Sequence, residues 1–110
     1  MIAQLRGYVF GVEDRDIEEA ARRFALLGDP TRLRILRTVM ECGEAPVHEI
    51  AHLSGASRFN TSAHLGRLAL AGLVSRRREG STVYYRVGDA SLPALCETMC
   101  ASLRARELVS

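Results

Sequence analysis

Apolar residues recur every three or four positions through most of this chain, whereas two short segments within residues 73–87 have the composition of β-strands. Gly28 ends the first helical pattern, and Asp29-Pro30 supplies the capping carboxylate and first-turn proline that begin a second helix. Ser57 likewise caps a later helix. The expected elements are helices over residues 17–27, 30–43, 46–53 and 57–72, strands over 73–78 and 82–87, and a helix over 91–107.

The order of these elements, α-α-α-α-β-β-α, predicts a mainly α (α+β) fold of the winged helix-turn-helix type. The 110 residues fit one domain. Its expected parts are an N-terminal arm over residues 1–12, a helix-turn-helix over 46–72, a wing over 73–87 and a C-terminal dimerisation helix over 91–107. In an isolated domain of this kind, the apolar stripes of the amphipathic helices at both ends would remain unburied. We therefore expect a homodimer formed through the terminal helices, which places the DNA-reading helix-turn-helix units of the two protomers side by side.

Positive charge is concentrated in the second half of the chain, although the formal net charge is only +2. Residues 58–86 contain six arginines and one acid, Glu79, whereas residues 13–19 contain five acids and one arginine. A basic half of this kind is the electrostatic footprint of a protein that contacts phosphates.

The expected fourth helix has two different faces. Leu65 and Leu68 point one way, while Asn60, His64 and Arg67 share another face. Such a helix packs its apolar side on a core and presents its polar side to base edges in a major groove. Double-stranded DNA is therefore the expected partner.

No apolar run reaches the roughly 20 residues that a membrane-spanning helix needs, so no membrane partner is expected. The start of the sequence lacks the basic, apolar and small-residue regions of a signal peptide. The three cysteines are an odd number without the spacing of a disulfide framework, which suits a reducing compartment. These features predict a cytoplasmic protein.

Four motifs follow one another within residues 17–104. They are A-L-L-G-D-P-T-R-L-R-I-L (25–36), V-H-E-I-A (47–51), S-A-H-L-G-R-L (62–68) and A-G-L-V-S-R-R-R-E-G-S-T-V-Y-Y-R-V (71–87). Together they resemble the ArsR/SmtB family of small bacterial repressors. The resemblance implies a homodimeric repressor of a DNA operator, whose affinity changes when a metal ion or an oxidant binds. Activation would use the same contacts as repression, and a separate sensory protein could supply the signal.

By this resemblance, the DNA contacts lie on the fourth helix and on the wing. The implied helix contacts are Ser57, Arg58, Asn60, Thr61, Ser62, His64 and Arg67, and the implied wing contacts are Arg77, Arg78, Gly80 and Ser81. Asparagine pairs with two atoms of adenine and arginine with two atoms of guanine, while serine or threonine binds phosphates. Phe59 would either meet a thymine methyl group or cover the turn before the helix.

The segment His48-Glu49-Ile50-Ala51-His52 matches the H-E-x-x-H signature of zinc hydrolases. Its context argues against that function, because Ile50 belongs to the expected helix-turn-helix core and the chain has no room for a substrate cleft with a third ligand. We therefore expect a protein that is not an enzyme. A small zinc hydrolase using Glu49 is the remote alternative.

His48 and His52 are better candidates for a regulatory metal ion. Family members that sense arsenic or cadmium carry C-V-C-[DE]-L in this helix, and the matching residues here are Pro46-Val47-His48-Glu49-Ile50. The thiolate site is therefore not retained. The imidazole pair, with oxygens from residues 13–16, favours nickel first and zinc second, with cobalt also suited. The alternative is two surface histidines without a metal.

The family's other metal site, on the last helix, is not expected here. Asp89 fits its start, but Ser91, Ser102 and Ala105 stand where ligands belong.

Cys96 and Cys100 stand one turn apart on the last helix, and Cys42 ends the second. They leave open a thiol- or redox-responsive regulator, as well as a regulator of the same fold without a ligand. Cys96 lies in the apolar stripe of its helix, so its expected role is in the core.

Overall fold

The structure, a computed structural model, describes residues 12–109. Its elements in chain order are α2 (Asp14–Leu27), α3 (Pro30–Cys42), β1 (Glu44–Pro46), α4 (Val47–Ser54), α5 (Arg58–Leu70), β2 (Val74–Glu79), β3 (Thr82–Val87) and α6 (Ser91–Val109). Apart from Val12, the expected N-terminal arm lies outside the described residues. None of the described helices is long and apolar enough to cross a membrane.

Local capping contacts fix where the central helices begin and end. The Asp29 carboxylate accepts a hydrogen bond of 2.9 Å from the backbone N–H of Arg32, and Pro30 opens α3. The Ser57 hydroxyl accepts one of 3.0 Å from the N–H of Asn60 and so caps α5. Gly55, with a φ of 79°, ends α4 in the left-handed conformation that glycine adopts most easily. The turn and both caps agree with the sequence prediction.

The core is built around α3, which contacts α4, α5, β1 and β3. Ile35, Leu36 and Val39 of this helix are fully buried. The other members of the buried cluster are Ala45, Ile50, Leu65, Leu68, Leu73, Val74, Tyr85 and Leu92. Burial of each large aliphatic side chain contributes roughly 1.5–3 kcal/mol to the folded state. Both helices of the helix-turn-helix are thereby fixed on α3.

The wing belongs to a three-stranded antiparallel sheet with the order β1-β3-β2. Its first strand, β1, is missing from the sequence prediction, so the observed order is α-α-β-α-α-β-β-α. A strand of three residues that ends in proline is too short to show alternation, and it forms because it pairs with β3. Pro46 is consequently the N-cap of α4 rather than its first residue.

Other boundaries differ from the prediction by a few residues. The helix α2 begins at Asp14 rather than at residue 17, because acidic residues in its first turn favour a helix N-terminus. The strand β2 begins at Val74 instead of Leu73, and α6 continues to Val109.

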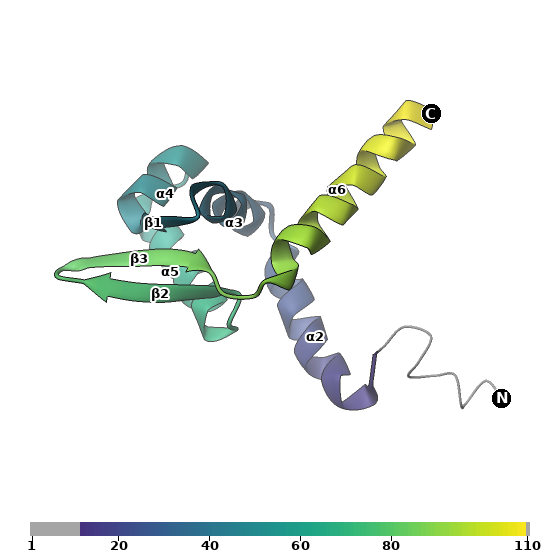
Figure 1. Ribbon diagram of the computed structural model, residues 1–110, viewed down its shortest axis with the longest axis horizontal. Coiled ribbons are helices and arrows are strands. Elements are labelled where there is room, and N and C mark those ends of the chain that lie inside the picture. The colour runs from purple at the N-terminus through teal and green to yellow at the C-terminus, as the bar shows by residue number, and fades with distance from the viewer. Residues whose placement is uncertain (1–11, 110) are drawn as a thin grey trace.

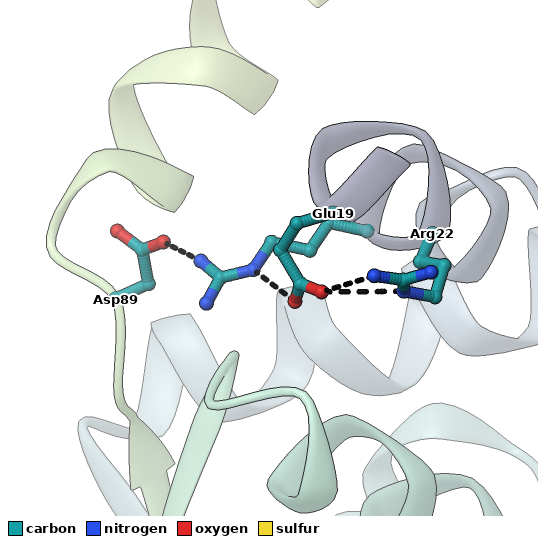
Figure 2. A network of polar contacts seen from close by, with 4 residues as sticks. Glu19, Arg22 and Asp89 are labelled. Atoms are coloured by element: carbon teal, nitrogen blue, oxygen red, sulfur yellow. Dashed lines mark hydrogen bonds and ion pairs between the residues drawn. The ribbon is translucent and has the colours of Figure 1, made fainter. Parts of the chain in front are cut away.

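Figure 1 shows α2 and α6 projecting from one side of the core, while the wing points the opposite way. Arg23 of α2 contacts the residue that leads into α6, because its Nη1 lies 3.0 Å from Oδ2 of Asp89, while its Nε lies 3.5 Å from Glu19 of the same helix (Figure 2). Asp89 also accepts hydrogen bonds from the hydroxyl and the N–H of Ser91, at 2.7 and 2.9 Å. The hydroxyl of Ser91, its backbone N–H and Arg23 together lower the pKa of Asp89. One carboxylate thus holds the start of α6 against α2.

Candidate nucleic-acid interface

The helix α5 separates apolar from polar side chains. Leu65 and Leu68 are fully buried against the core. Of the seven predicted helix contacts, five are exposed, His64 is half-buried and Thr61 is buried; the exposed five are Ser57, Arg58, Asn60, Ser62 and Arg67. These residues run from the N-cap of α5 to its last turn, and the N–H groups of its first turn also favour bound phosphates. These polar groups occupy the broad exposed side of the helix, where Arg58 and Ser62 line one hollow and Arg67 lines another.

Thr61 differs from the sequence prediction. It is fully buried, and its hydroxyl has no hydrogen-bond partner among the described residues. Its place on the helix, four residues before Leu65, puts it on the apolar face, because residues four apart lie above one another. Thr61 therefore fills the core beneath α5 and does not reach DNA from this position.

Ser57 and His64 each have a structural partner in addition to their predicted role. The Ser57 oxygen accepts the capping hydrogen bond from Asn60, which leaves its O–H proton free to be donated to a phosphate. Nδ1 of His64 accepts a hydrogen bond of 3.2 Å from Nε of Arg32. With Nδ1 acting as acceptor, the ring proton is on Nε2, and Nε2–H is the group that remains for DNA.

The predicted wing residues Arg77, Arg78, Gly80 and Ser81 are all exposed around the β2–β3 turn. Gly80 has a φ of 62°, a conformation that side-chain-bearing residues rarely adopt, so the tight turn depends on it. Arg77 is held by Glu44 and Glu79 and stacks on the ring of Tyr84. The wing is thus a short, ordered hairpin that carries three consecutive arginines.

Arg76 is a further arginine of the wing that is not among the predicted DNA contacts. It is exposed and lines a hollow between α5 and β2 together with Arg67. The strand pattern contained the necessary signal, because Arg76 and Arg78 are two residues apart and so project from the same face.

The reading helix and the wing form one continuous surface. A second hollow lies between α4, α5 and the wing turn, and its lining includes Arg58, Phe59, Ser62 and Ser81. Phe59 is 82% exposed, so it does not cover the turn before the helix. Predicted contacts from two separate parts of the sequence therefore lie beside the same hollow.

Comparison with known proteins identifies relatives for most of the chain. The model of the family described as "Bacterial regulatory protein, arsR family" matches residues 29–76. A cadmium resistance regulator of the CadC type from Staphylococcus aureus is 34% identical over 92 residues, which cover 84% of this chain and 74% of the relative. The chain belongs to the ArsR family. It is a DNA-binding transcriptional regulator of that type.

Other relatives of this ArsR-family protein differ in the signals that their names state. A probable mercury resistance operon repressor from Streptomyces lividans is 40% identical over 72 residues, covering 66% of this chain and 57% of the relative. Among solved structures, a homodimeric winged helix-turn-helix domain from Mycobacterium bovis has a TM-score of 0.70 and 34% identity, covering 82% of this chain and 88% of that one. The antimony-specific repressor AntR has a TM-score of 0.78 and 25% identity, with 88% and 87% covered. The chain thus spans a little over half to three quarters of the curated relatives compared.

His48 and His52 of this ArsR-family protein lie exposed on α4, on either side of the buried Ile50 and Ala51. The described residues contain no group of three or more His, Cys, Asp or Glu side chains placed to hold a metal ion. The predicted oxygen ligands in residues 13–16 start α2, which projects from the opposite side of the core from α4 (Figure 1). That part of the prediction is wrong for a single chain, because sequence charge alone does not place a segment in space.

The cysteines have different surroundings. Cys96 is half-buried and Cys100 is exposed, and both line an apolar hollow with Phe24, Leu95 and Met99. Burial raises the pKa of the Cys96 thiol, with a smaller contribution from Cys100. Burial raises the pKa of Cys42 too, together with the carboxylates of Glu49 and Glu41. A raised pKa lowers the fraction of reactive thiolate, which disfavours Cys42 and Cys96 as oxidant sensors.

Proposed function

We propose that this regulator is a homodimeric repressor, with each protomer reading one half-site of its operator. The observation that carries the proposal is that polar and apolar residues are exposed at opposite ends of the molecule. Polar residues of α5 and of the wing turn line one hollow, whereas exposed apolar side chains gather on α2 and α6. These two helices lie at the end of the molecule opposite the wing (Figure 1). The names of the mercury and antimony relatives, both repressors, support the sign of regulation.

The dimer is proposed to form through α2 and α6. Phe24 is 60% exposed, Met99 61% and Leu103 50%, and a cluster of exposed apolar side chains of this kind marks an interaction surface. A second copy would cover these side chains and set the two α5 helices about one turn of DNA apart. The homodimer named for the M. bovis domain supports this arrangement.

Within each half-site, Asn60 and Arg67 are proposed to contact base edges in the major groove. Ser57, Arg58 and Ser62 would bind the flanking phosphates near the N-terminus of α5, where the helix dipole favours anions. Replacing Arg67 with alanine is expected to weaken operator binding by about 1–3 kcal/mol and to relax specificity at one base position. The test is a binding measurement on the DNA upstream of the protein's own gene against random DNA. Equal affinities for the two would overturn the proposal.

The signal is proposed to be a metal ion bound through His48 and His52, with nickel first and zinc second. The two imidazoles are exposed and one turn apart on α4, the helix that leads into α5. Imidazole nitrogens suit these borderline ions. Two ligands do not complete a four- to six-coordinate site, so the remaining ligands must come from outside the described part of one chain.

A second candidate signal is a softer, thiophilic ion bound through Cys96 and Cys100. The one-turn spacing on α6 and the relatives named for mercury, cadmium and antimony support it. Both candidates treat the protein as a regulator without catalytic activity, since the names of its relatives denote regulators.

Calorimetry of the reduced protein distinguishes the two sites. The double variant His48→Ala/His52→Ala should lose nickel and zinc binding and keep any cadmium binding, whereas Cys96→Ser/Cys100→Ser should do the reverse. Operator affinity is measured in each state, because a regulatory ion must bind the two DNA-binding states with different affinity. If neither ion class binds, the metal proposal fails, and a separate sensory protein or a regulator without a ligand takes its place.

A further inference from the structure

The register of the wing places its three consecutive arginines on two faces of the sheet. Arg77 lies opposite Tyr84, whereas Arg76 lies opposite Tyr85. Directly opposed residues share a face and successive residues alternate, so Arg77 is on one face and Arg76 and Arg78 are on the other. Tyr85 is buried, which identifies the face of Arg76 and Arg78 as the inner face, toward the core and α5.

On the outer face, Arg77 is surrounded by partners. Its Nε and Nη2 lie 3.2 and 2.8 Å from the two oxygens of Glu44, a two-point contact between guanidinium and carboxylate. Its Nη1 lies 2.7 Å from Glu79, and its Cζ lies 4.7 Å from the centre of the Tyr84 ring. The hydrogen bonds from Arg77 lower the pKa of Glu44, and those to both carboxylates raise the pKa of Arg77.

This cluster offers little positive charge to a phosphate. Two carboxylates face the one guanidinium of Arg77, and Arg86, directly opposite Glu44 in the sheet, makes the group neutral overall. A DNA phosphate would have to compete with Glu44 and Glu79 for the same N–H groups. An isolated exposed ion pair contributes little, but a two-point contact within a network orders the side chains that form it.

The inner face has the opposite character. Arg76 lines a hollow with Arg67 of α5, and Arg78 lies opposite Val83, which lines the second hollow beside Phe59. Neither Arg76 nor Arg78 forms an ion pair with a carboxylate in the described part of the chain, and the only contact of either with an aromatic ring there is that of Arg76 with Tyr85. Two uncompensated guanidinium groups therefore lie on the side of the wing that faces the reading helix.

We infer that Arg77 is a positioning residue that fixes the wing to β1, and that Arg76 and Arg78 are the wing residues that bind DNA phosphates. This inference rests on the DNA-binding function and changes the role that the sequence prediction gave to Arg77. Glu44 lies in β1, and the last residue of that strand, Pro46, caps α4. The Arg77–Glu44 contact thus ties the wing directly to the helix-turn-helix and sets the angle at which the inner face meets the DNA backbone.

The test measures affinity for the duplex upstream of the protein's own gene over a series of salt concentrations. Each phosphate contact adds about 0.9 to the slope of log affinity against log salt, so Arg76→Ala and Arg78→Ala should each reduce it by about 1.8 in a dimer with two wings. Arg77→Met should weaken binding roughly fivefold for each wing, the upper end of what one exposed ion pair contributes, with an unchanged slope.

Two further variants separate positioning from direct contact. Arg77→Lys keeps a cation that binds phosphate well but loses the planar fork that fits Glu44, so it should weaken binding as Arg77→Met does. Glu44→Ala removes a negative charge, which would strengthen DNA binding if Arg77 were freed to contact phosphate. We expect it instead to weaken binding with an unchanged slope, and the double variant Arg77→Met/Glu44→Ala to be no weaker than either single variant.

Glu41→Ala is the matched control, because it removes an exposed carboxylate from α3 without touching the wing. Thermal unfolding of each variant checks that the fold is intact. A reduced slope in Arg77→Met, tight binding by Arg77→Lys, or tighter binding by Glu44→Ala than by Glu41→Ala would overturn the inference. Loss of any preference for the upstream duplex in the unaltered protein would instead contradict the proposed function.

Discussion

The Nε atom of Arg32 donates a hydrogen bond of 3.2 Å to Nδ1 of His64, joining the first turn of α3 to the middle of the reading helix. Nη1 of the same guanidinium donates one of 3.0 Å to the backbone carbonyl of Leu26 in α2. One side chain therefore connects a proposed dimerisation helix with a predicted DNA-contacting residue. A shift of α2 would therefore move the Arg32 side chain and change its hydrogen bond to His64.

Two substitutions of His64 separate its structural bond from its DNA contact. His64→Asn keeps an oxygen acceptor near the position of Nδ1 and loses the outward N–H, so operator affinity should fall by about 1 kcal/mol with unfolding unchanged. His64→Gln keeps a donor near Nε2 and loses the bond from Arg32, so unfolding free energy should fall by a similar amount, about 1 kcal/mol. Chemical denaturation and DNA titration measure the two effects. Equal DNA affinities of the two variants would show that Nε2–H makes no contact.

Ser57 is expected to have two separable roles. Ser57→Ala removes the N-cap of α5 and should lower the free energy of unfolding by about 1 kcal/mol. Ser57→Asp restores a cap of similar strength, so its stability should match that of the original protein. The added carboxylate should nevertheless weaken DNA binding at all sequences, because it stands beside the phosphates. An aspartate variant that binds DNA normally would remove Ser57 from the interface.

Much of this arrangement could be predicted because its causes are local in the sequence. Asp29-Pro30 and Ser57 determine where two helices start, through hydrogen bonds between residues only three positions apart. The spacing of Leu65 and Leu68 identifies the buried face of α5. The same spacing places Thr61 on that buried face, although the resemblance assigned it to DNA.

The remaining differences arise from contacts between distant segments. The strand β1 exists because it pairs with β3, about 40 residues further along the chain, and no local pattern marks it. The role of Arg77 depends on Glu44, which lies 33 residues earlier in the sequence. The acidic residues at the start of α2 lie apart from His48 and His52 because contacts between distant segments also set the positions of α2 and α4. Long-range pairing, rather than composition, decides these positions.

The proposed dimer interface can be tested with single charges. Phe24→Glu or Met99→Glu would place a carboxylate in the apolar surface of α2 and α6, where burial without a partner is unfavourable. Each variant should sediment as a monomer and lose most operator affinity, since only one half-site is then held. Leu70→Glu is the control for sedimentation alone, because Leu70 is 92% exposed at the end of α5, away from α2 and α6, but lines the hollow that Arg67 and Arg76 share. Dimers that persist in both interface variants would place the interface elsewhere.

The Asp89 carboxylate should make stability depend on pH in the acid range. Its pKa is held below the ordinary value of 3.8 by the hydroxyl and N–H of Ser91 and by Arg23. A lowered pKa stabilises the folded protein above that ordinary value, and the stabilisation is lost as the pH falls through the folded-state pKa. Asp89→Asn should therefore be less stable at neutral pH and show a flatter decline in acid. Urea unfolding from pH 2 to 7 measures this, with Glu18→Gln on the exposed face of α2 as control.

Phe59 is expected to read the methyl group of a thymine. The ring is 82% exposed in the first turn of α5, beside Arg58 and Ser62, and apolar contact with the thymine methyl is the interaction that a major groove offers to such a side chain.

Replacing that thymine by deoxyuridine removes the methyl group and nothing else. The original protein should then bind about fourfold more weakly, the equivalent of about 0.8 kcal/mol for one buried carbon. Phe59→Ala should bind both duplexes equally, whereas Phe59→Leu should keep part of the difference because it remains apolar. A scan of single deoxyuridine substitutions through the operator locates the base. If no substitution weakens the original protein more than Phe59→Ala, the exposed ring reads no thymine, and its role must be sought in contacts with the DNA backbone.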